Sequence, residues 1–160
     1  MLFRQIYHSP IGEITIIASD KALVGVWLAD QKYFAEGLPN QTITNQANAI
    51  TQLVDQWLEL YFHKSPPPQL QITYNNTRLT PFRQQVWQTL QTVPWGQTIT
   101  YQQLAQQVAN KNYTRAVAQA VSHNPFTLIV PCHRVVGQGH QLTGFAGGLE
   151  RKRWLLNWEQ

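Results

Sequence analysis

Hydrophobic and polar residues alternate along much of the first thirty residues, with the spacing of two that is typical of half-buried β-strands. Ile14 and Ile16 alternate with polar neighbours, and a second run with the same period covers residues 23–28. Gly12 and the polar residues 19–21 stand where turns are needed. The start of the chain is therefore predicted to form a small antiparallel sheet.

Between residues 50 and 62 the apolar positions recur every three or four residues, which is the period of an amphipathic helix. They are Ile50, Leu53, Val54, Trp57, Leu58, Tyr61 and Phe62. A loop around residues 37–40 precedes this helix, and the three prolines at 66–68 cannot continue it. Alternating apolar residues at 70–74 predict one more strand. This half contains no cluster of candidate catalytic residues.

The second half is predicted to be mostly helical. Thr80 can cap a helix that has a proline at its first position. Thr100 has Gln103 three residues later, a capping box that begins a second helix. A polar turn at residues 110–112 joins it to a third helix at about residues 113–122. Two short helices joined by a tight polar turn indicate a helix-turn-helix.

The pattern changes near residue 77, so we expect two domains, residues 1–77 and residues 78–160. The predicted class is α/β: a small N-terminal α+β domain, formed by an antiparallel sheet with a helix, precedes a mostly helical, winged helix-turn-helix-like domain. A last helix is expected at residues 149–158. Its basic run of Arg151, Lys152 and Arg153 is expected to face solvent or phosphate.

Composition narrows the class of protein. The 160 residues hold one cysteine, so no disulfide can form within the chain and a zinc site built on several thiolates is excluded. No apolar run approaches the ~20 residues that a membrane helix needs. The first residues lack the basic, apolar and small-residue regions of an export signal. We therefore expect a cytoplasmic protein that makes no contact with membranes.

Charge is divided unevenly between the two halves. Residues 1–80 carry five basic and six acidic residues, whereas residues 81–160 carry seven basic and two acidic ones, for net charges of −1 and +5. A basic domain attracts polyanions, among which nucleic acid is the commonest soluble candidate. On the third helix, the small residues Thr114, Ala116 and Ala118 lie near Arg115. Such residues let a helix press against the narrow minor groove, although they are also ordinary helix residues.

The only cysteine, Cys132, lies in an apolar run and is followed at once by His133. A free cysteine often packs as an inert hydrophobe, and His133 could equally be a hydrogen-bonded structural histidine. A nucleophilic thiol needs a base within reach and a group that orients this base. The only acids in this half are Glu150 and Glu159. A relay of Cys132, His133 and Glu159 is chemically sensible, and the alternative for Glu159 is a solvated end charge.

Five motifs of the second half occur in the order and spacing of one protein family. They are residues 100–105 (Thr-Tyr-Gln-Gln-Leu-Ala), 115–117 (Arg-Ala-Val), 124–125 (Asn-Pro), 131–136 (Pro-Cys-His-Arg-Val-Val) and 144–149 (Gly-Phe-Ala-Gly-Gly-Leu). With these motifs the chain resembles the O6-alkylguanine-DNA alkyltransferases over about residues 79–159. Residues 1–77 are similar in layout to the smaller domain of that family.

The resemblance implies a single-turnover DNA repair protein that transfers an alkyl group from O6-alkylguanine to Cys132, with O4-alkylthymine as a second candidate lesion. It implies that His133 acts through a water as the base and that Glu159 orients His133. The implied partner is double-stranded DNA containing alkylated bases, bound from its minor-groove side by a monomer. Neither a metal nor a cofactor is implied.

The resemblance also implies roles for residues around the thiol. Tyr101 would contact the flipped base and the phosphate 3′ to it. The backbone carbonyl of Val135, like that of Cys132, would accept a hydrogen bond from the guanine amine, and the Ala146 N–H would reach toward O6. Asn124 would bond the backbone between the third helix, which the resemblance makes the recognition helix, and the active site.

The recognition helix is expected to supply the DNA-binding face. Arg115 would enter the space that the flipped base vacates, and Thr114, Ala116 and Ala118 would line the minor groove. Three positions depart from common choices in the family, since Phe145, Ala146 and Thr127 stand where members often have Tyr, Ser and Pro.

Related alkyltransferase-like proteins, which only bind lesions, have Trp in place of the cysteine, so Cys132 argues against that class. Two other functions are kept as alternatives. A non-catalytic DNA-binding module is motivated by the helix-turn-helix and the basic half, and a Cys-His hydrolase is motivated by the dyad alone.

Overall fold

The computed structural model describes residues 1–38 and 40–160 of the chain. These residues form two compact units, Met1–Arg78 and Leu79–Gln160. Of the loop predicted around residues 37–40, residue 39 lies outside the described residues. The division into folding domains at residues 77 and 78 stays a prediction.

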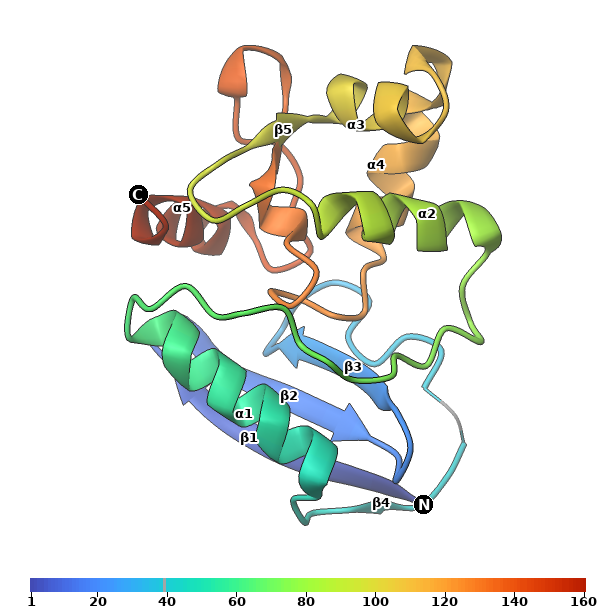
Figure 1. Cartoon of the computed structure of the whole chain (residues 1–160), viewed down its shortest axis with the longest axis vertical. Helices are drawn as coiled ribbons and strands as arrows, with labels where there is room; N and C mark the ends of the chain where they lie inside the picture. Colours follow the sequence, from blue (N-terminus) through green and yellow to red (C-terminus); the bar gives the residue numbers. More distant parts are fainter. Residues whose placement is uncertain (39) are drawn as a thin grey trace. The chain divides into compact units, whose positions relative to one another are not determined.

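The first unit is built on a four-stranded sheet in the order β3-β2-β1-β4. As the alternation of residues predicts, β1 pairs antiparallel with β2 and β2 with β3, whereas the short β4 joins β1 in parallel. The strands are β1 Leu2–Ser9, β2 Gly12–Ala18, β3 Leu23–Leu28 and β4 Ile43–Thr44. The predicted helix, α1 (Ala49–Phe62), packs on β1 and β2 (Figure 1).

Local hydrogen bonds fix where these elements begin and end. The Ser9 hydroxyl donates to the Gly12 carbonyl (2.6 Å) and accepts from the Ile11 amide (3.2 Å). Gly12 has a φ of 113°, which side chains other than glycine rarely tolerate. Asn48 caps α1 by accepting from the Thr51 amide (2.9 Å). The buried positions of α1 are Thr51, Val54, Leu58, Tyr61 and Phe62.

The strand predicted at residues 70–74 is not formed, so that prediction is wrong. A single bridge joins Tyr74 to Leu23. It is held by the Leu23 amide on the Thr73 carbonyl (2.8 Å) and by the Asn75 amide on the Leu23 carbonyl (2.8 Å). The other apolar residues of this segment remain partly exposed. The alternation there buries too little apolar surface to extend the pairing.

The second unit begins with three short helices that pack on one another. They are α2 (Pro81–Leu90), α3 (Tyr101–Val108) and α4 (Thr114–Ser122). The predicted caps are present, because Thr80 accepts from the Arg83 amide (3.1 Å) and Thr100 forms a capping box with Gln103. The third helix begins one residue later than predicted, since Lys111–Tyr113 forms a 3₁₀ turn.

The helix pair α3 and α4 is anchored on α2 through Trp87. The indole N–H of Trp87 donates to the Ala120 carbonyl of α4 (3.2 Å), and the ring meets Phe126 edge-on at a centroid distance of 5.7 Å. The inward positions predicted for both helices are buried: Leu104, Ala105, Val108, Val117 and Val121. The helix-turn-helix of the sequence is therefore a packed unit.

Two short strands connect this helix pair to the only cysteine. The strand β5 (Ile99–Thr100) runs directly into α3 and pairs in parallel with β6 (Val135–Val136), which follows the cysteine. The last helix, α5 (Leu149–Trp158), has the predicted bounds and is dark red in Figure 1. Within the described part of the chain, no helix has the length and apolar character needed to span a membrane.

Candidate active site

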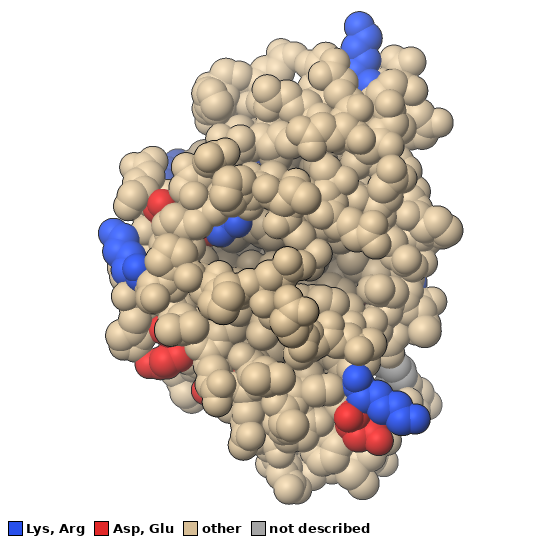
Figure 2. Space-filling view, in the orientation of Figure 1, with Lys and Arg blue, Asp and Glu red and all other residues tan. Residues whose placement is uncertain are grey.

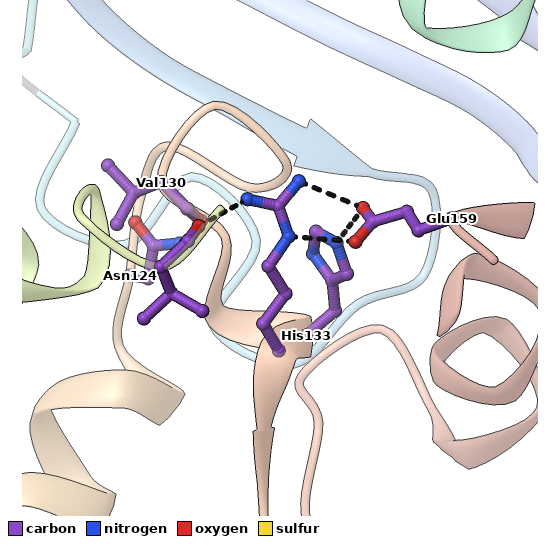
Figure 3. A network of polar contacts seen from close by, with 6 residues as sticks. Asn124, Val130, His133 and Glu159 are labelled. Atoms are coloured by element: carbon purple, nitrogen blue, oxygen red, sulfur yellow. Dashed lines mark hydrogen bonds and ion pairs between the residues drawn. The ribbon is translucent and has the colours of Figure 1, made fainter. Parts of the chain in front are cut away.

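Cys132 begins a 3₁₀ turn, Cys132–Arg134, that immediately precedes β6. Its side chain is buried (4% exposed), and its amide donates to the Val130 carbonyl (2.7 Å). The side-chain amide of Asn124 donates to the same carbonyl (2.9 Å), and its oxygen accepts from the Phe126 amide (2.9 Å). Figure 3 shows Asn124 directed at Val130. The thiol is thus carried by a buried turn whose backbone is fixed from two sides.

His133 is completely buried, and its side chain points to Glu159 at the end of α5 (Figure 3). Its Nε2 lies 2.6 Å from Glu159 Oε2. Arg134 holds the same carboxylate through Nε to Oε1 (2.8 Å) and Nη2 to Oε2 (3.1 Å), and its Nη1 donates to the Val93 carbonyl (2.7 Å). Glu159 is 2% exposed. It is therefore a buried carboxylate held by His133 and Arg134, and it is not a solvated end charge.

These contacts decide which groups carry protons. Burial alone would raise the pKa of Glu159, but the contacts with His133 and Arg134 outweigh burial and hold that pKa well below its usual range. Burial lowers the pKa of His133, which the Glu159 carboxylate opposes only in part. We therefore assign an ionised Glu159 and a neutral His133. Because a carboxylate can only accept, His133 Nε2 carries the proton and the ring's lone pair lies on Nδ1.

Lys152 does not face solvent or phosphate as predicted, because its side chain is completely buried. In a helix, residues three and four apart share one face. Lys152, Leu155 and Glu159 follow that spacing, and all three are buried. The signal for this burial was therefore present in the sequence, although it lay within a run of basic residues.

The Lys152 ammonium connects β6 to the glycine-rich loop at residues 144–148 and to Thr143 before it. It donates to the carbonyls of Val135, Thr143 (2.9 Å) and Gly144 (3.0 Å). These bonds use all three N–H groups of an ammonium. Two backbone segments that are separate in sequence, β6 and residues 143–144, thus meet at one buried cation on α5.

The charge of this cation acts on the thiol of Cys132. Burial raises the pKa of Cys132, as its apolar setting predicts, while the hydrogen bond with Asn124 and the charge of Lys152 act in the opposite direction. Burial lowers the pKa of Lys152 to about 8, and the charge of Cys132 opposes that change. A nearby cation favours the thiolate. The site therefore holds a cation whose charge favours a thiolate.

Tyr101, the first residue of α3, also contacts the glycine-rich loop. Its hydroxyl donates to the carbonyls of Thr143 (3.0 Å) and Gly144 (3.3 Å), which also accept from Lys152. Burial raises the pKa of Tyr101 to about 12, and the charge of Cys132 acts in the same direction. The phenol is therefore protonated at neutral pH and can donate a hydrogen bond.

A cavity of about 430 Å³ opens beside Tyr101 and extends to Thr114, the first residue of α4. Its lining residues are Thr100, Tyr101, Gln102, Thr114, Gly137 and Gln138. Its volume lies within the range of small-molecule pockets. Cys132 is not among the lining residues, so the cavity borders the site without opening onto the thiol.

The remaining predicted residues lie at different depths around Cys132. Val135 is buried at the start of β6, with its carbonyl bonded to Lys152, and Ala146 is half-buried in the glycine-rich loop. Among residues 1–38 and 40–160, no three His, Cys, Asp or Glu side chains gather in a way that could hold a metal ion.

The outer face of α4 is open. Arg115 and Ala116 are exposed, and Thr114 and Ala118 are half-buried. The positive charge counted for residues 81–160 is not all at the surface, because Arg134 and Lys152 are buried. Figure 2 shows only scattered Lys and Arg side chains on the face that it displays.

Two family models match the chain. The 6-O-methylguanine DNA methyltransferase DNA-binding domain matches residues 81–160, and the ribonuclease-like domain of the same family matches residues 2–72. A methylated-DNA–protein-cysteine methyltransferase of Mycolicibacterium paratuberculosis is 38% identical over 153 residues, which cover 95% of this chain and 88% of the relative. The protein of the same name from Haemophilus influenzae is 34% identical over 164 residues, covering 99% and 87%.

Solved structures agree with these matches over nearly the whole length. The crystal structure of Mycobacterium tuberculosis OGT in complex with DNA has a TM-score of 0.84 at 35% identity, and the match covers 98% of this chain and 92% of that one. That of M. tuberculosis O6-methylguanine methyltransferase has a TM-score of 0.83 at 34% identity, covering 99% and 93%. The chain therefore belongs to the 6-O-methylguanine DNA methyltransferase family.

Proposed function

We propose that this protein repairs DNA by moving an alkyl group from O6 of guanine in duplex DNA onto Sγ of Cys132, once per molecule. The observation that carries this proposal is the buried contact of His133 with Glu159, 2.6 Å long, next to the only cysteine of a chain of this family. O4-alkylthymine is a second candidate lesion, because it also carries an alkyl group on an exocyclic base oxygen.

The first step is loss of the thiol proton. His133 donates from Nε2 to Glu159, so its Nδ1 can accept a proton from Cys132 through a bridging water. Arg134 keeps Glu159 ionised and in place through two hydrogen bonds. The Lys152 charge favours the thiolate that forms. Glu159 and Arg134 thus act through His133 and do not touch the substrate.

In the second step the Cys132 sulfur attacks the alkyl carbon. A carbon–sulfur bond forms while the bond from this carbon to O6 breaks, and its electron pair remains on the guanine. Tyr101 can stabilise the developing negative charge by donating to the base at N3. To do so, its hydroxyl must exchange the Thr143 and Gly144 carbonyls for the nucleotide. The thioether product is stable in water, so each molecule reacts once.

The base is held by the backbone of the turn and the loop. The carbonyls of Cys132 and Val135 accept from the guanine amine, and the Ala146 N–H reaches toward O6. The Val135 carbonyl already accepts from Lys152, but a carbonyl oxygen has two lone pairs and can accept twice. Asn124 supports this arrangement by fixing the turn through Val130.

The DNA approaches α4 with its minor groove. The O6 alkyl group is out of reach within a stacked duplex, so the nucleotide must leave the stack, which costs a few kcal/mol. Arg115 is exposed and can fill the space left by the base, while Thr114, Ala116 and Ala118 let the helix lie close to the groove. We place the reaction in the cytoplasm and assign it to a monomer. It needs no metal or cofactor, because the thiolate itself displaces the base.

Intact-mass measurement tests the proposal. After incubation with a duplex that contains O6-methylguanine, the protein should gain the mass of one methyl group, and the Cys132→Ala variant should gain none. If the protein binds the duplex and its mass does not change, it is a DNA-binding module without this activity. Turnover on an ester or amide substrate would instead indicate a Cys-His hydrolase.

A further inference from the structure

An exposed aromatic residue stands directly before the recognition helix. Tyr113 is 45% exposed and is the last residue of the 3₁₀ turn that leads into α4. Single exposed apolar residues are common on protein surfaces and need no explanation by themselves. This one lies two residues before Arg115, at the start of the helix that is proposed to contact DNA.

The Tyr113 ring is held in place. It packs against Phe82 of α2 at a centroid distance of 5.7 Å and an interplanar angle of 35°. The turn beneath it is also fixed, because the Tyr113 amide donates to the Asn110 carbonyl (3.0 Å) and the Asn110 side chain accepts from the Asn112 amide (2.9 Å). A braced ring loses little conformational entropy when it makes a further contact.

Basic residues flank the ring on both sides along the chain. Lys111 and Arg115 are exposed, and Tyr113 lies midway between them. A basic, aromatic, basic alternation suits a sugar–phosphate backbone, since cations meet phosphates while the ring meets the apolar edge of a deoxyribose or a base. This short segment therefore carries both charge and apolar area, and a sugar–phosphate backbone can use both.

We propose that Tyr113, braced by Phe82, is a DNA-contacting residue that packs against the deoxyribose edge of the minor groove beside the gap that Arg115 fills. This inference rests on the proposed function, because it takes α4 as the DNA-binding helix. The contact holds the duplex in register while the nucleotide is turned out. It takes no part in the chemistry at Cys132, so a free base gains nothing from it.

Two measurements test this role. In a Cys132→Ala background, which separates binding from transfer, Tyr113→Ala should raise the Kd for a duplex containing O6-methylguanine about tenfold, the equivalent of ~1.4 kcal/mol. Tyr113→Phe should bind nearly as tightly as the parent, because the ring makes the contact. With Cys132 intact, Tyr113→Ala should react with the free O6-methylguanine base at the wild-type rate.

Phe34 provides a matched control. It is 44% exposed and packs against Trp27 of the first unit at 5.7 Å, so Phe34→Ala removes a comparable braced ring. The Kd for the duplex should not change in that variant. Unchanged duplex binding in Tyr113→Ala would overturn the proposal, and so would equal losses with duplex and free base, which would indicate a structural role. Failure of the wild-type protein to accept a methyl group from duplex would instead refute the proposed function.

Discussion

The buried centre around Cys132 and the outer face of α4 belong to the same unit but hold their polar groups in opposite ways. In the centre, Arg134 and Lys152 are buried, and they donate to the Glu159 carboxylate or to backbone carbonyls. On α4, Arg115 and Ala116 face solvent. The proposed function assigns the chemistry to the first region and contact with DNA to the second.

Under the proposed function, this difference separates the chemistry from DNA recognition. Groups fixed before the substrate arrives need no reorganisation during the transfer, and small exposed residues leave room for a helix to approach a groove. A substitution in the centre should therefore slow transfer from every substrate. A substitution on α4 should slow transfer from duplex DNA alone.

Glu159→Gln should have the largest effect. The amide cannot supply the negative charge that orients and supports a protonated His133, so transfer should slow about a hundredfold, the scale of general base catalysis. The loss should be the same for duplex and free base, and DNA affinity should stay nearly unchanged. Single-turnover kinetics measures the transfer rate with each substrate, and a binding titration measures the DNA affinity. Glu150→Gln, an exposed acid in the first turn of α5, serves as control. A wild-type rate in Glu159→Gln would remove Glu159 from the relay.

Arg115→Ala should slow transfer from duplex DNA about thirtyfold, since losing ~2 kcal/mol of support for the flipped state changes a rate by that factor. Transfer from the free O6-alkylguanine base should keep its wild-type rate. The comparison uses the same protein preparation with both substrates. Lys21→Ala, which removes an exposed basic residue of the first unit, controls for net charge. Equal losses on the two substrates would take Arg115 out of the gap-filling role.

Lys152→Met should slow transfer from both substrates about tenfold, because the thiolate loses its nearby cation. It should also lower the free energy of unfolding by ~3 kcal/mol, since the carbonyls of Val135, Thr143 and Gly144 lose a buried donor. Denaturant titration gives the stability, and rates are compared where the variant is fully folded. Arg153→Met, an exposed neighbour, should change neither quantity. A folded variant with an unaltered rate would show that the cation does not assist the thiol.

The stability of the protein should also depend on pH through Glu159. The folded-state pKa of Glu159 lies below its ordinary value of 4.5, so its contribution to stability is present above about pH 4.5 and is lost as pH falls through the lower folded value. The wild-type protein should therefore lose stability below about pH 4.5 more steeply than Glu159→Gln. Urea unfolding over a series of pH values measures the two slopes. Equal slopes for the two proteins would mean that the contacts with His133 and Arg134 do not lower the pKa of Glu159.

Local signals in the sequence predicted most of the second unit. The caps at Thr80 and Thr100, the helix pair and the bounds of α5 depend on residues that are close in sequence, and they occur as predicted. In the first unit the same holds for the antiparallel strands. The strand predicted at 70–74 fails because its pairing depends on burial that this segment does not achieve.

The supports of the active site could not be predicted in the same way. Arg134 and Lys152 were assigned no place in the site, since charged side chains are mostly exposed. Their burial depends on partners far along the chain, as in the bond of Arg134 to Val93, 41 residues away, and that of Lys152 to Val135, 17 residues away. The resemblance implies roles for Cys132, His133 and Glu159. The structure adds Arg134, which holds Glu159, and Lys152, whose charge acts on the thiol.

A titration of lesion against protein tests the central claim most directly. A fixed amount of protein receives increasing amounts of duplex carrying one O6-methylguanine, and the methyl group is located by peptide mass mapping. The account predicts that methylation stops at one group per chain, on the peptide that contains Cys132, however great the excess of lesion. Repair of more lesions than there are protein molecules, or a Cys132 peptide without the methyl group, would contradict it.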